Sequence, residues 1–172
     1  MANKIVYMEA ESRYAKVFED NRDMGDKLPE GSDMKNKLEQ TQGQYVVDLV
    51  VTPEAKAKAI ADGIPATGMI GQRWKTDPEG NDYYKASRKH FNPNMTDRET
   101  GQKGVTQGPP TVVKVEGDAV VPWDFETDGY IGNGSKVVAK FSVWEGKIVD
   151  LVALKVVEQV EWEPEDDQGY GF

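Results

Sequence analysis

The sequence predicts a mainly β domain with five or six short strands and one or two short helices. Three features predict this fold class: stretches rich in β-branched residues, alternation of apolar and polar residues within them, and glycine- or proline-containing turns between them. Alternation that leaves one face polar favours an antiparallel sheet. At 172 residues, the chain is long enough for one domain with a hydrophobic core.

The first strand is predicted at residues 14–20 (YAKVFED), and a polar, glycine-containing loop is expected at residues 20–43. Within this loop, one helical turn is expected around Met34 to Leu38. A loop this long in a small domain is usually functional or mobile. Residues 44–52 (QYVVDLVVT) are rich in β-branched side chains, which predicts a second strand.

A short helix should follow the second strand. Thr52 can cap this helix, Pro53 suits its first position, and Gly63 can end it. Residues 64–82 are expected to be irregular. Residues 83–91 (YYKASRKHF) are strand-like, although both faces of the strand carry side chains that are unusual for a core strand.

Strand signals dominate the second half of the chain. Residues 92–110 are rich in Gly, Pro and Asn, which predicts a loop. Turns at Gly117, Gly134 and Gly146 should separate the later strands. These strands are predicted at residues 110–115, 119–123, 135–144 and 148–162.

This set of elements predicts a small barrel or sandwich. The OB-fold, a five-stranded antiparallel Greek-key barrel that often binds oligonucleotides, is the natural candidate. One such domain is assigned to residues 1–160, followed by a flexible acidic tail at residues 161–172. No run of about 18 apolar residues exists, so no membrane span is expected.

The charge of the chain is segregated along its length. The net charge is −9, and residues 156–172 hold six acids and no base. Residues 73–103 hold seven bases and five acids, so this stretch is mildly basic. Segregation of this kind suggests an interaction tail attached to a near-neutral body.

Basic and aromatic residues interleave in residues 73–75 (RWK) and 83–91. Single-stranded nucleic acid needs this mixture, because unpaired bases stack on aromatic rings and phosphates attract Lys and Arg. The same aromatics fit ordinary core positions about equally well, and the same bases fit a solvated face. The predicted contacts to single-stranded DNA are Arg73, Trp74, Lys75, Tyr83, Tyr84, Lys85, Arg88, Lys89 and Phe91.

Lys136 and Lys140 are also predicted DNA contacts, provided that their face of the strand lines the binding groove. Both share a strand face with Trp144. They contact phosphate if that face lines a binding groove, and they serve solubility alone if it is an outer wall. The residues do not decide between the two.

The sequence lacks the residues that several kinds of catalytic and metal-binding sites require. The chain has no Cys and a single His, His90, which excludes disulfides and thiolate sites and weakens any Ser–His or two-histidine zinc mechanism. The acids are too loosely spaced for a calcium loop. We therefore assign no catalytic residue, metal or cofactor. The cluster of Trp123, Phe125 and Tyr130 is more typical of a core plug than of a binding site.

The chain ends in EPEDDQGYGF (residues 163–172). A disordered solubilising end would explain the acids but has no need of an aromatic tip. We hypothesise that the acids occupy the protein's own basic groove when DNA is absent. Otherwise they reach a basic patch on another protein while the terminal aromatic fills a pocket there. The residues assigned to this role are Glu163, Glu165, Asp166, Asp167, Tyr170 and Phe172.

Four stretches together resemble the single-stranded DNA-binding proteins of tailed bacteriophages. The segment IGNGSKV, before a strand with alternating lysines, is the most specific part of the resemblance. With their spacings, the stretches cover most of the chain from about Tyr14. They are QYVVDLVV (44–51), GPPTVVKVEGD (108–118), YIGNGSKVVAKFSVW (130–144) and EPEDDQGYGF (163–172).

The resemblance implies an OB-fold protein that coats and protects single-stranded DNA during phage replication, recombination and repair. It implies a C-terminal tail that contacts replication proteins such as polymerase and helicase-primase. The protein is then expected in the cytoplasm of the infected bacterium. The resemblance leaves a homodimer open as the oligomeric state.

Two other function classes remain open from the residues. One is an acidic protein-interaction module, such as an inhibitor or a virion accessory protein, that does not bind nucleic acid. The other is a metal-dependent hydrolase of nucleic acid. The hydrolase is disfavoured, because the sequence has no compact carboxylate cluster and no second histidine.

Overall fold

The computed structural model describes residues 3–68 and 73–163. Its strands are β1 Lys4–Lys16, β2 Gln44–Val51, β3 Trp74–Thr76, β4 Asp82–Lys89, β5 Phe91–Thr96, β6 Lys103–Thr106, β7 Thr111–Glu116, β8 Ala119–Pro122, β9 Lys136–Trp144 and β10 Ile148–Glu158. Its helices are the 3₁₀ helix η1 Glu19–Asn21 and the α-helices α1 Asp33–Gln40, α2 Pro53–Asp62 and α4 Phe125–Asp128.

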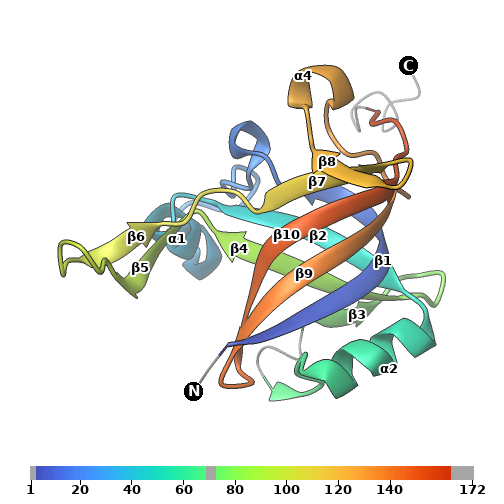
Figure 1. The fold of residues 1–172 in the computed structure, drawn as a ribbon. Helices are drawn as coiled ribbons and strands as arrows, with labels where there is room; N and C mark the ends of the chain where they lie inside the picture. The colour runs from blue at the N-terminus through green and yellow to red at the C-terminus, as the bar shows by residue number, and fades with distance from the viewer. Residues whose placement is uncertain (1–2, 69–72, 164–172) are drawn as a thin grey trace.

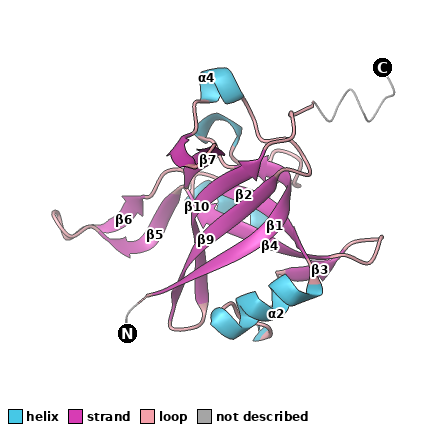
Figure 2. Ribbon diagram, turned by 45° about the vertical axis from the view of Figure 1, so that its right-hand side comes forward, coloured by secondary structure: helices cyan, strands magenta, loops and turns pink. Residues whose placement is uncertain are grey.

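Eight strands form one curved sheet in the order β3-β4-β2-β1-β9-β10-β7-β8, and β5 and β6 form a separate two-stranded sheet. Figures 1 and 2 show α2 at one end of the curved sheet, α4 at the other end, and the β5–β6 hairpin projecting from the side. The prediction of a mainly β fold is confirmed. No helix in the described ranges is both long and apolar enough to cross a membrane.

The prediction for the first strand was wrong, because β1 begins ten residues earlier than residue 14. Alternation in KIVYMEAES buries Val6 and Met8, while the small side chains of Ala10 and Ser12 continue the inward face. Residues 17–21 leave the sheet, and Glu19–Asn21 form η1. Because Ala10 and Ser12 are small or polar, the inward face of β1 lacks the regular large apolar residues that would predict a strand.

The predictions for β2 and α2 are confirmed. Tyr45, Val47, Leu49 and Val51 are buried at every second position of β2. The Thr52 hydroxyl accepts the Ala55 backbone N–H at 3.1 Å, Pro53 begins the helix, and Gly63 ends it at a φ of 133°. The expected helical turn in the long loop is the two-turn helix α1, which Ser32 caps.

The predicted loop at residues 92–110 instead contains the β5–β6 hairpin. The Asp97 side chain accepts the backbone N–H groups of Glu99 and Thr100, which fixes the hairpin turn. Gly104 leaves room for the Phe91 ring, which a Cβ at residue 104 would strike. Of the Gly and Asn residues that suggested a loop, Asn92 and Asn94 lie in β5 and Gly104 lies in β6, whereas Gly101 lies between the two strands.

The later strands lie close to their predicted positions. β7 and β8 form the expected hairpin, and β9 and β10 pair in an antiparallel ladder. The sheet is not wholly antiparallel, because β10 pairs in parallel with β7. β10 also ends at Glu158, four residues before the predicted end.

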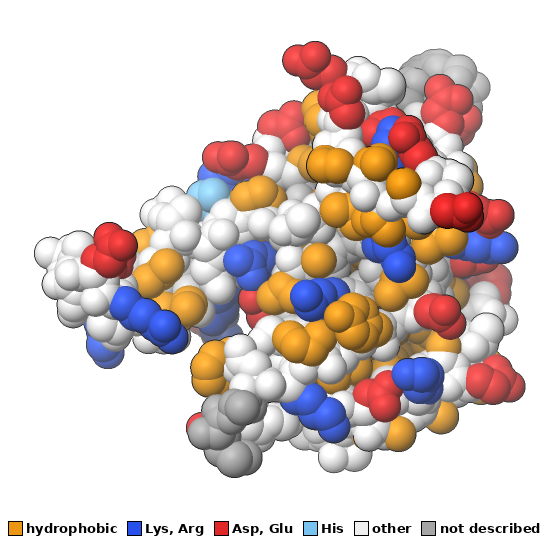
Figure 3. Space-filling view, viewed as in Figure 1, with side chains coloured by type: hydrophobic (Ala, Val, Ile, Leu, Met, Phe, Trp, Pro, Cys, Tyr) orange, Lys and Arg blue, Asp and Glu red, His pale blue; other side chains and the backbone are white. Residues whose placement is uncertain are grey.

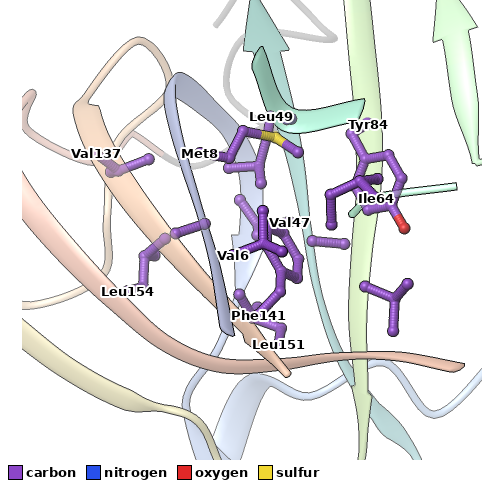
Figure 4. Close-up of a cluster of buried hydrophobic side chains, with 14 of the residues drawn as sticks. Val6, Met8, Val47, Leu49, Ile64, Tyr84, Val137, Phe141, Leu151 and Leu154 are labelled. Atoms are coloured by element: carbon purple, nitrogen blue, oxygen red, sulfur yellow. The ribbon is translucent and has the colours of Figure 1, made fainter. Parts of the chain in front are cut away.

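The core fills the inner side of the curved sheet. Figure 4 shows side chains from β1, β2, β4, β9 and β10 that point toward one another. Ile64, just after α2, also lies in this cluster. Its largest fully buried members are Tyr84, Phe141, Met8, Leu49, Ile64, Ile131, Leu151 and Leu154.

Arg88 makes three hydrogen bonds, one of which joins β4 to β10. Its Nη1 donates to Asp150 Oδ2 at 2.5 Å, and its other nitrogens donate to the carbonyls of Gly108 and Gln107. Burial raises the pKa of Asp150, and the charge of Arg88 opposes that rise. The two strands are ends of the central five-strand run β4-β2-β1-β9-β10, so this contact brings the run back on itself.

An aromatic cluster covers the end of the sheet near α4. Phe18 packs against Trp123 and Phe125, and Tyr130 packs against Phe125 and Trp162 with ring centroids about 5 Å apart. The Trp123 Nε1–H donates to a backbone carbonyl, and the ring lies against the core. The interpretation of this cluster as a plug fits these contacts.

Candidate nucleic-acid interface

The basic and aromatic stretch of β4 is divided between two faces of the sheet. Register with β2 places Tyr84 and Ala86 opposite the inward residues Leu49 and Val47. The residues between them face outward. The outward set is Tyr83, Lys85, Ser87 and Lys89, as period-two alternation requires.

The outward side chains of β4 join those of its neighbours in a surface that we call the basic face. Lys75 of β3 lies opposite Tyr83, and Lys85 lies opposite Asp48 of β2. Arg13 of β1 lies on the other side of Asp48. The basic face consists of Arg13, Arg73, Lys75, Tyr83, Lys85 and Lys89, with Asp48 among them.

Four cations of the basic face lack an acidic partner. Arg73, Lys75, Lys85 and Lys89 form no ion pair with any residue of the described ranges. Arg73 donates instead to the Ser87 hydroxyl. Unpaired cations side by side repel one another, so the surface favours an anion.

Asp48 lies among these cations, opposite both Lys85 and Arg13. Burial raises its pKa, and the charges of Lys85, Arg13 and Lys75 oppose that rise. Those three cations therefore lie close enough to act on the same carboxyl group. Arg13 also forms an ion pair with Asp77 at 3.0 Å, so it is less available to a ligand than the lysines.

Tyr84 must be removed from the predicted DNA contacts, because it is fully buried. Its ring makes edge contacts with Trp74 and Phe141, at 4.8 and 5.7 Å between centroids. Burial raises the pKa of its hydroxyl to about 12. A ring enclosed in this way cannot stack on a base.

Trp74 and Phe91 are both half-buried and engaged within the protein. The Trp74 Nε1–H donates to the Pro65 carbonyl at 3.2 Å, and Lys56 Nζ lies 5.3 Å from the ring centroid. Phe91 covers Gly104 in the β5–β6 hairpin. These contacts within the protein explain the positions of both rings.

Arg88 and Lys136 do not belong to the basic face. Arg88 donates hydrogen bonds to Asp150 and to two backbone carbonyls, so its role is structural. Lys136 pairs with Glu158 at 3.1 Å and lies opposite Glu11 on β1. Acids on both sides leave little attraction for a phosphate at Lys136.

Lys140 lies elsewhere on the outward side of the sheet. It is opposite Tyr7 of β1 and forms no ion pair with a described residue. The sequence-based prediction missed both Tyr7 and Arg13. The alternation of Ile5, Tyr7, Glu9 and Glu11 against Val6 and Met8 could have indicated them, had β1 been recognised.

His90 has a structural position at the base of the hairpin. Its Nδ1 is hydrogen-bonded to the Tyr45 hydroxyl at 2.6 Å, and burial lowers its pKa. Its carbonyl accepts the backbone N–H groups of Gln107 and Gly108. In residues 3–68 and 73–163, no three His, Asp or Glu side chains gather as metal ligands would.

The start of the C-terminal tail is fixed to the body. The Val160 backbone N–H donates to Ser135 Oγ at 2.8 Å, and the Gly132 N–H donates to the Val160 carbonyl at 3.0 Å. Glu163 is exposed and is the last described residue. The other predicted tail contacts, Glu165, Asp166, Asp167, Tyr170 and Phe172, lie outside the described residues.

No protein-family model and no curated protein matches the chain. Among solved structures, the chain is similar to one described as "Single-stranded DNA-binding protein from bacteriophage Enc34". The TM-score is 0.53 at 13% identity, and the match covers 98% of this chain and 90% of that chain. At this identity the likeness shows a shared fold. The comparison thereby supports a mainly β fold shared with this phage protein.

Proposed function

We propose that the protein binds single-stranded DNA on the basic face and that it does so without catalysis. The observation that carries the proposal is the set of four cations on one outward surface with no acidic partner among the described residues. The exposed part of Tyr83 lies beside Lys75 and offers an aromatic surface to an unpaired base. A protein of the same fold carries the name of a single-stranded DNA-binding protein.

We infer an OB-type barrel as the scaffold of this surface. Two observations support the inference: the strand order β4-β2-β1-β9-β10, and the Arg88–Asp150 contact between its two end strands. Residues 1–160 would form this domain and residues 161–172 the acidic tail. β3 next to β4, and β7 and β8 next to β10, extend the sheet beyond these five strands.

The cellular role follows as part of the same proposal. The protein would coat and protect single-stranded DNA during phage replication, recombination and repair in the cytoplasm of the infected bacterium. Its tail would recruit replication proteins such as polymerase and helicase-primase. The charge distribution along the chain supports this proposal, because residues 156–172 hold six acids and no base. Figure 3 shows acidic side chains near α4 and β8.

The proposal is tested by reversing one charge of the basic face. Lys85→Glu should weaken binding to fluorescent oligo-dT about tenfold at low salt, because it removes one phosphate contact and adds repulsion. Fluorescence anisotropy measures the affinity across a salt series. The slope of log K against log salt should also become shallower by about 0.7, the value for one phosphate contact on a single strand.

Lys58→Glu is the matched control, because it changes the net charge equally on the exposed surface of α2. Equal losses for Lys58→Glu and Lys85→Glu would show a nonspecific charge effect and contradict the assignment of the basic face. Binding of a basic protein with no response to oligo-dT would favour the protein-interaction module instead.

A further inference from the structure

A second outward surface, on β1, β9 and β10, carries large apolar side chains in contact with water. We call Ile5, Tyr7, Trp144 and Ile148, together with Lys140, the aromatic platform. Tyr7 is 54% exposed and Trp144 is 45% exposed. Figure 3 shows apolar side chains on this side of the molecule with Lys and Arg side chains among them.

Strand register makes the aromatic platform continuous. Tyr7 lies opposite Lys140, and Trp144 lies opposite Ile148. Ile5 lies opposite Ser142, which is the outward residue between Lys140 and Trp144 on β9. The members of the platform are therefore direct or diagonal neighbours across three strands.

The exposed Tyr7 and Trp144 side chains are not explained by packing within the protein. Neither the Tyr7 ring nor the Trp144 ring packs against another aromatic ring in the described ranges. Ser142 is 7% exposed, and its Oγ has no hydrogen-bond partner among the described residues. A buried hydroxyl without a partner costs about 1–3 kcal/mol, which a surface shaped for stability alone would avoid.

The charge of the aromatic platform suits a polyanion. Lys140 forms no ion pair with a described residue, and it lies beside the Tyr7 ring. The nearest acid on β10, Asp150, is neutralised by Arg88. Burial raises the pKa of Asp150, and the charges of Arg88, Lys89 and Arg73 oppose that rise. Asp150 lies opposite Ser142 of β9, and Arg88 lies between Ser87 and Lys89 on β4, so this ion pair connects the strands that carry the two surfaces.

The spacing of the two rings fits a nucleic-acid strand. Lys140, opposite Tyr7, lies four residues from Trp144 along β9, which is about 13 Å of strand. Stacked nucleotides rise about 3.4 Å each, so about four nucleotides cover this span. Aromatic rings separated by a few nucleotides, with a cation beside one of them, match a single strand whose bases are unpaired.

We propose that the aromatic platform is a second contact segment for the same single-stranded DNA, an inference that rests on the proposed function. Tyr7 and Trp144 stack on unpaired bases, and Lys140 contacts a phosphate next to the base that stacks on Tyr7. The strand passes from the basic face on β4 over the Arg88–Asp150 pair to the outward side of β9. Duplex DNA would leave both rings unused, because its bases are already stacked.

Tryptophan fluorescence tests the contact at Trp144. Oligo-dT should quench the wild-type protein, and Trp144→Phe should remove a large part of that quenching. Trp162→Phe is the matched control, since Trp162 is 42% exposed and packs against Tyr130 in the aromatic cluster near α4. Quenching unchanged by Trp144→Phe would overturn the proposal.

Anisotropy with fluorescent oligo-dT tests the energetic role. Tyr7→Ala and Trp144→Ala should each weaken binding about tenfold, the usual effect of one lost base stack. Wild-type affinity in both variants, with Lys85→Glu still weakened, would reject the platform and leave the proposed function intact. No binding by the wild-type protein would reject both.

Sedimentation velocity separates DNA from a second copy of the chain as the occupant. The proposal expects Tyr7→Ala to leave the oligomeric state unchanged while DNA binding weakens. A dimer that Tyr7→Ala dissociates, with oligo-dT affinity unchanged, would show that the platform is a subunit interface and would overturn the inference.

Discussion

Tyr83 and Tyr84 are adjacent in sequence, but their side chains lie on opposite faces of β4. Tyr83 faces outward beside Lys75, whereas Tyr84 is fully buried between Trp74 and Phe141. Alternation along β4 separates them, and the sequence shows that alternation. It does not show which face is inward, because both faces mix aromatic residues with bases. That choice depends on pairing with β2, whose pattern is unambiguous.

Replacing Tyr84 by Phe should leave DNA binding unchanged and should not lower stability. The Tyr84 hydroxyl is buried without a hydrogen-bond partner among the described residues, so its removal should raise the free energy of unfolding by about 1 kcal/mol. Urea unfolding measures the change. Tyr45→Phe is the contrasting variant, since it deletes a hydrogen bond to His90 and should destabilise the protein. A large loss in Tyr84→Phe would contradict the packing described.

Asp48 should weaken DNA binding, and its protonation should relieve this effect. Burial raises the pKa of Asp48, so its carboxyl group becomes neutral at a higher pH than an exposed aspartate would. Oligo-dT affinity should therefore rise as pH falls through that pKa. Asp48→Asn should bind a few-fold more tightly at neutral pH, because one repulsive charge is gone.

Asp48→Asn should also lose the pH-dependent gain. Anisotropy titrations at constant ionic strength from acidic to neutral pH measure both effects. An affinity that falls in Asp48→Asn would mean that the carboxylate holds the lysines in place and does not repel the ligand.

Arg88 and Asp150 should respond unequally to substitution. Arg88→Met leaves a partly buried carboxylate and two carbonyls without their donor, which should cost about 2–3 kcal/mol of unfolding free energy. Asp150→Asn should cost less, because Arg88 keeps both carbonyls and a desolvated charge is removed. Urea unfolding of the two variants compares them directly. Equal losses would show that the ion pair itself carries the stability.

At the scale of elements, strands with β-branched inward residues could be predicted, and strands with short or polar ones could not. β2 and β9 bury Val, Leu and Phe at alternate positions, so their bounds were predicted closely. β1 continues inward with Ala10 and Ser12, and β3 has three residues. These two strands depend on partners distant in sequence, which local pattern does not report.

The β5–β6 hairpin was not predicted from the sequence, for a different reason. It stands apart from the main sheet and buries little, so it has no apolar face to predict it. Its shape depends instead on close packing of Phe91 over Gly104 and on the Asp97 turn. Such an element should open more easily than the curved sheet.

Gly104→Ala should loosen the hairpin with little effect on the rest of the protein. A Cβ at this position would strike the Phe91 ring, and the φ of 103° disfavours Ala. Hydrogen exchange should accelerate at residues 91–106 while the midpoint of thermal unfolding changes little. Gly101→Ala is the control, because it has a φ of 72° but open space around its Cβ position. Equal acceleration in both variants would assign the effect to backbone strain alone.

At the scale of the whole molecule, the net charge of −9 conceals a surface suited to an anion. The charge totals predicted a segregated chain, and the fold adds the spatial part by turning Lys75, Lys85 and Lys89 to one side. β1 was not recognised in the sequence, so the place of Arg13 on the basic face and of Tyr7 on the proposed aromatic platform was missed. The fold class could therefore be predicted from sequence, and the site only in part.

The most direct test of the account is the affinity of the wild-type protein for oligo-dT and for duplex DNA of the same length, measured by anisotropy at low and high salt. The account predicts tight binding to oligo-dT, a clear loss of affinity at high salt, and weaker binding to the duplex, whose bases are not available for stacking. Equal affinity for both DNAs, or no binding to oligo-dT at low salt, would contradict it.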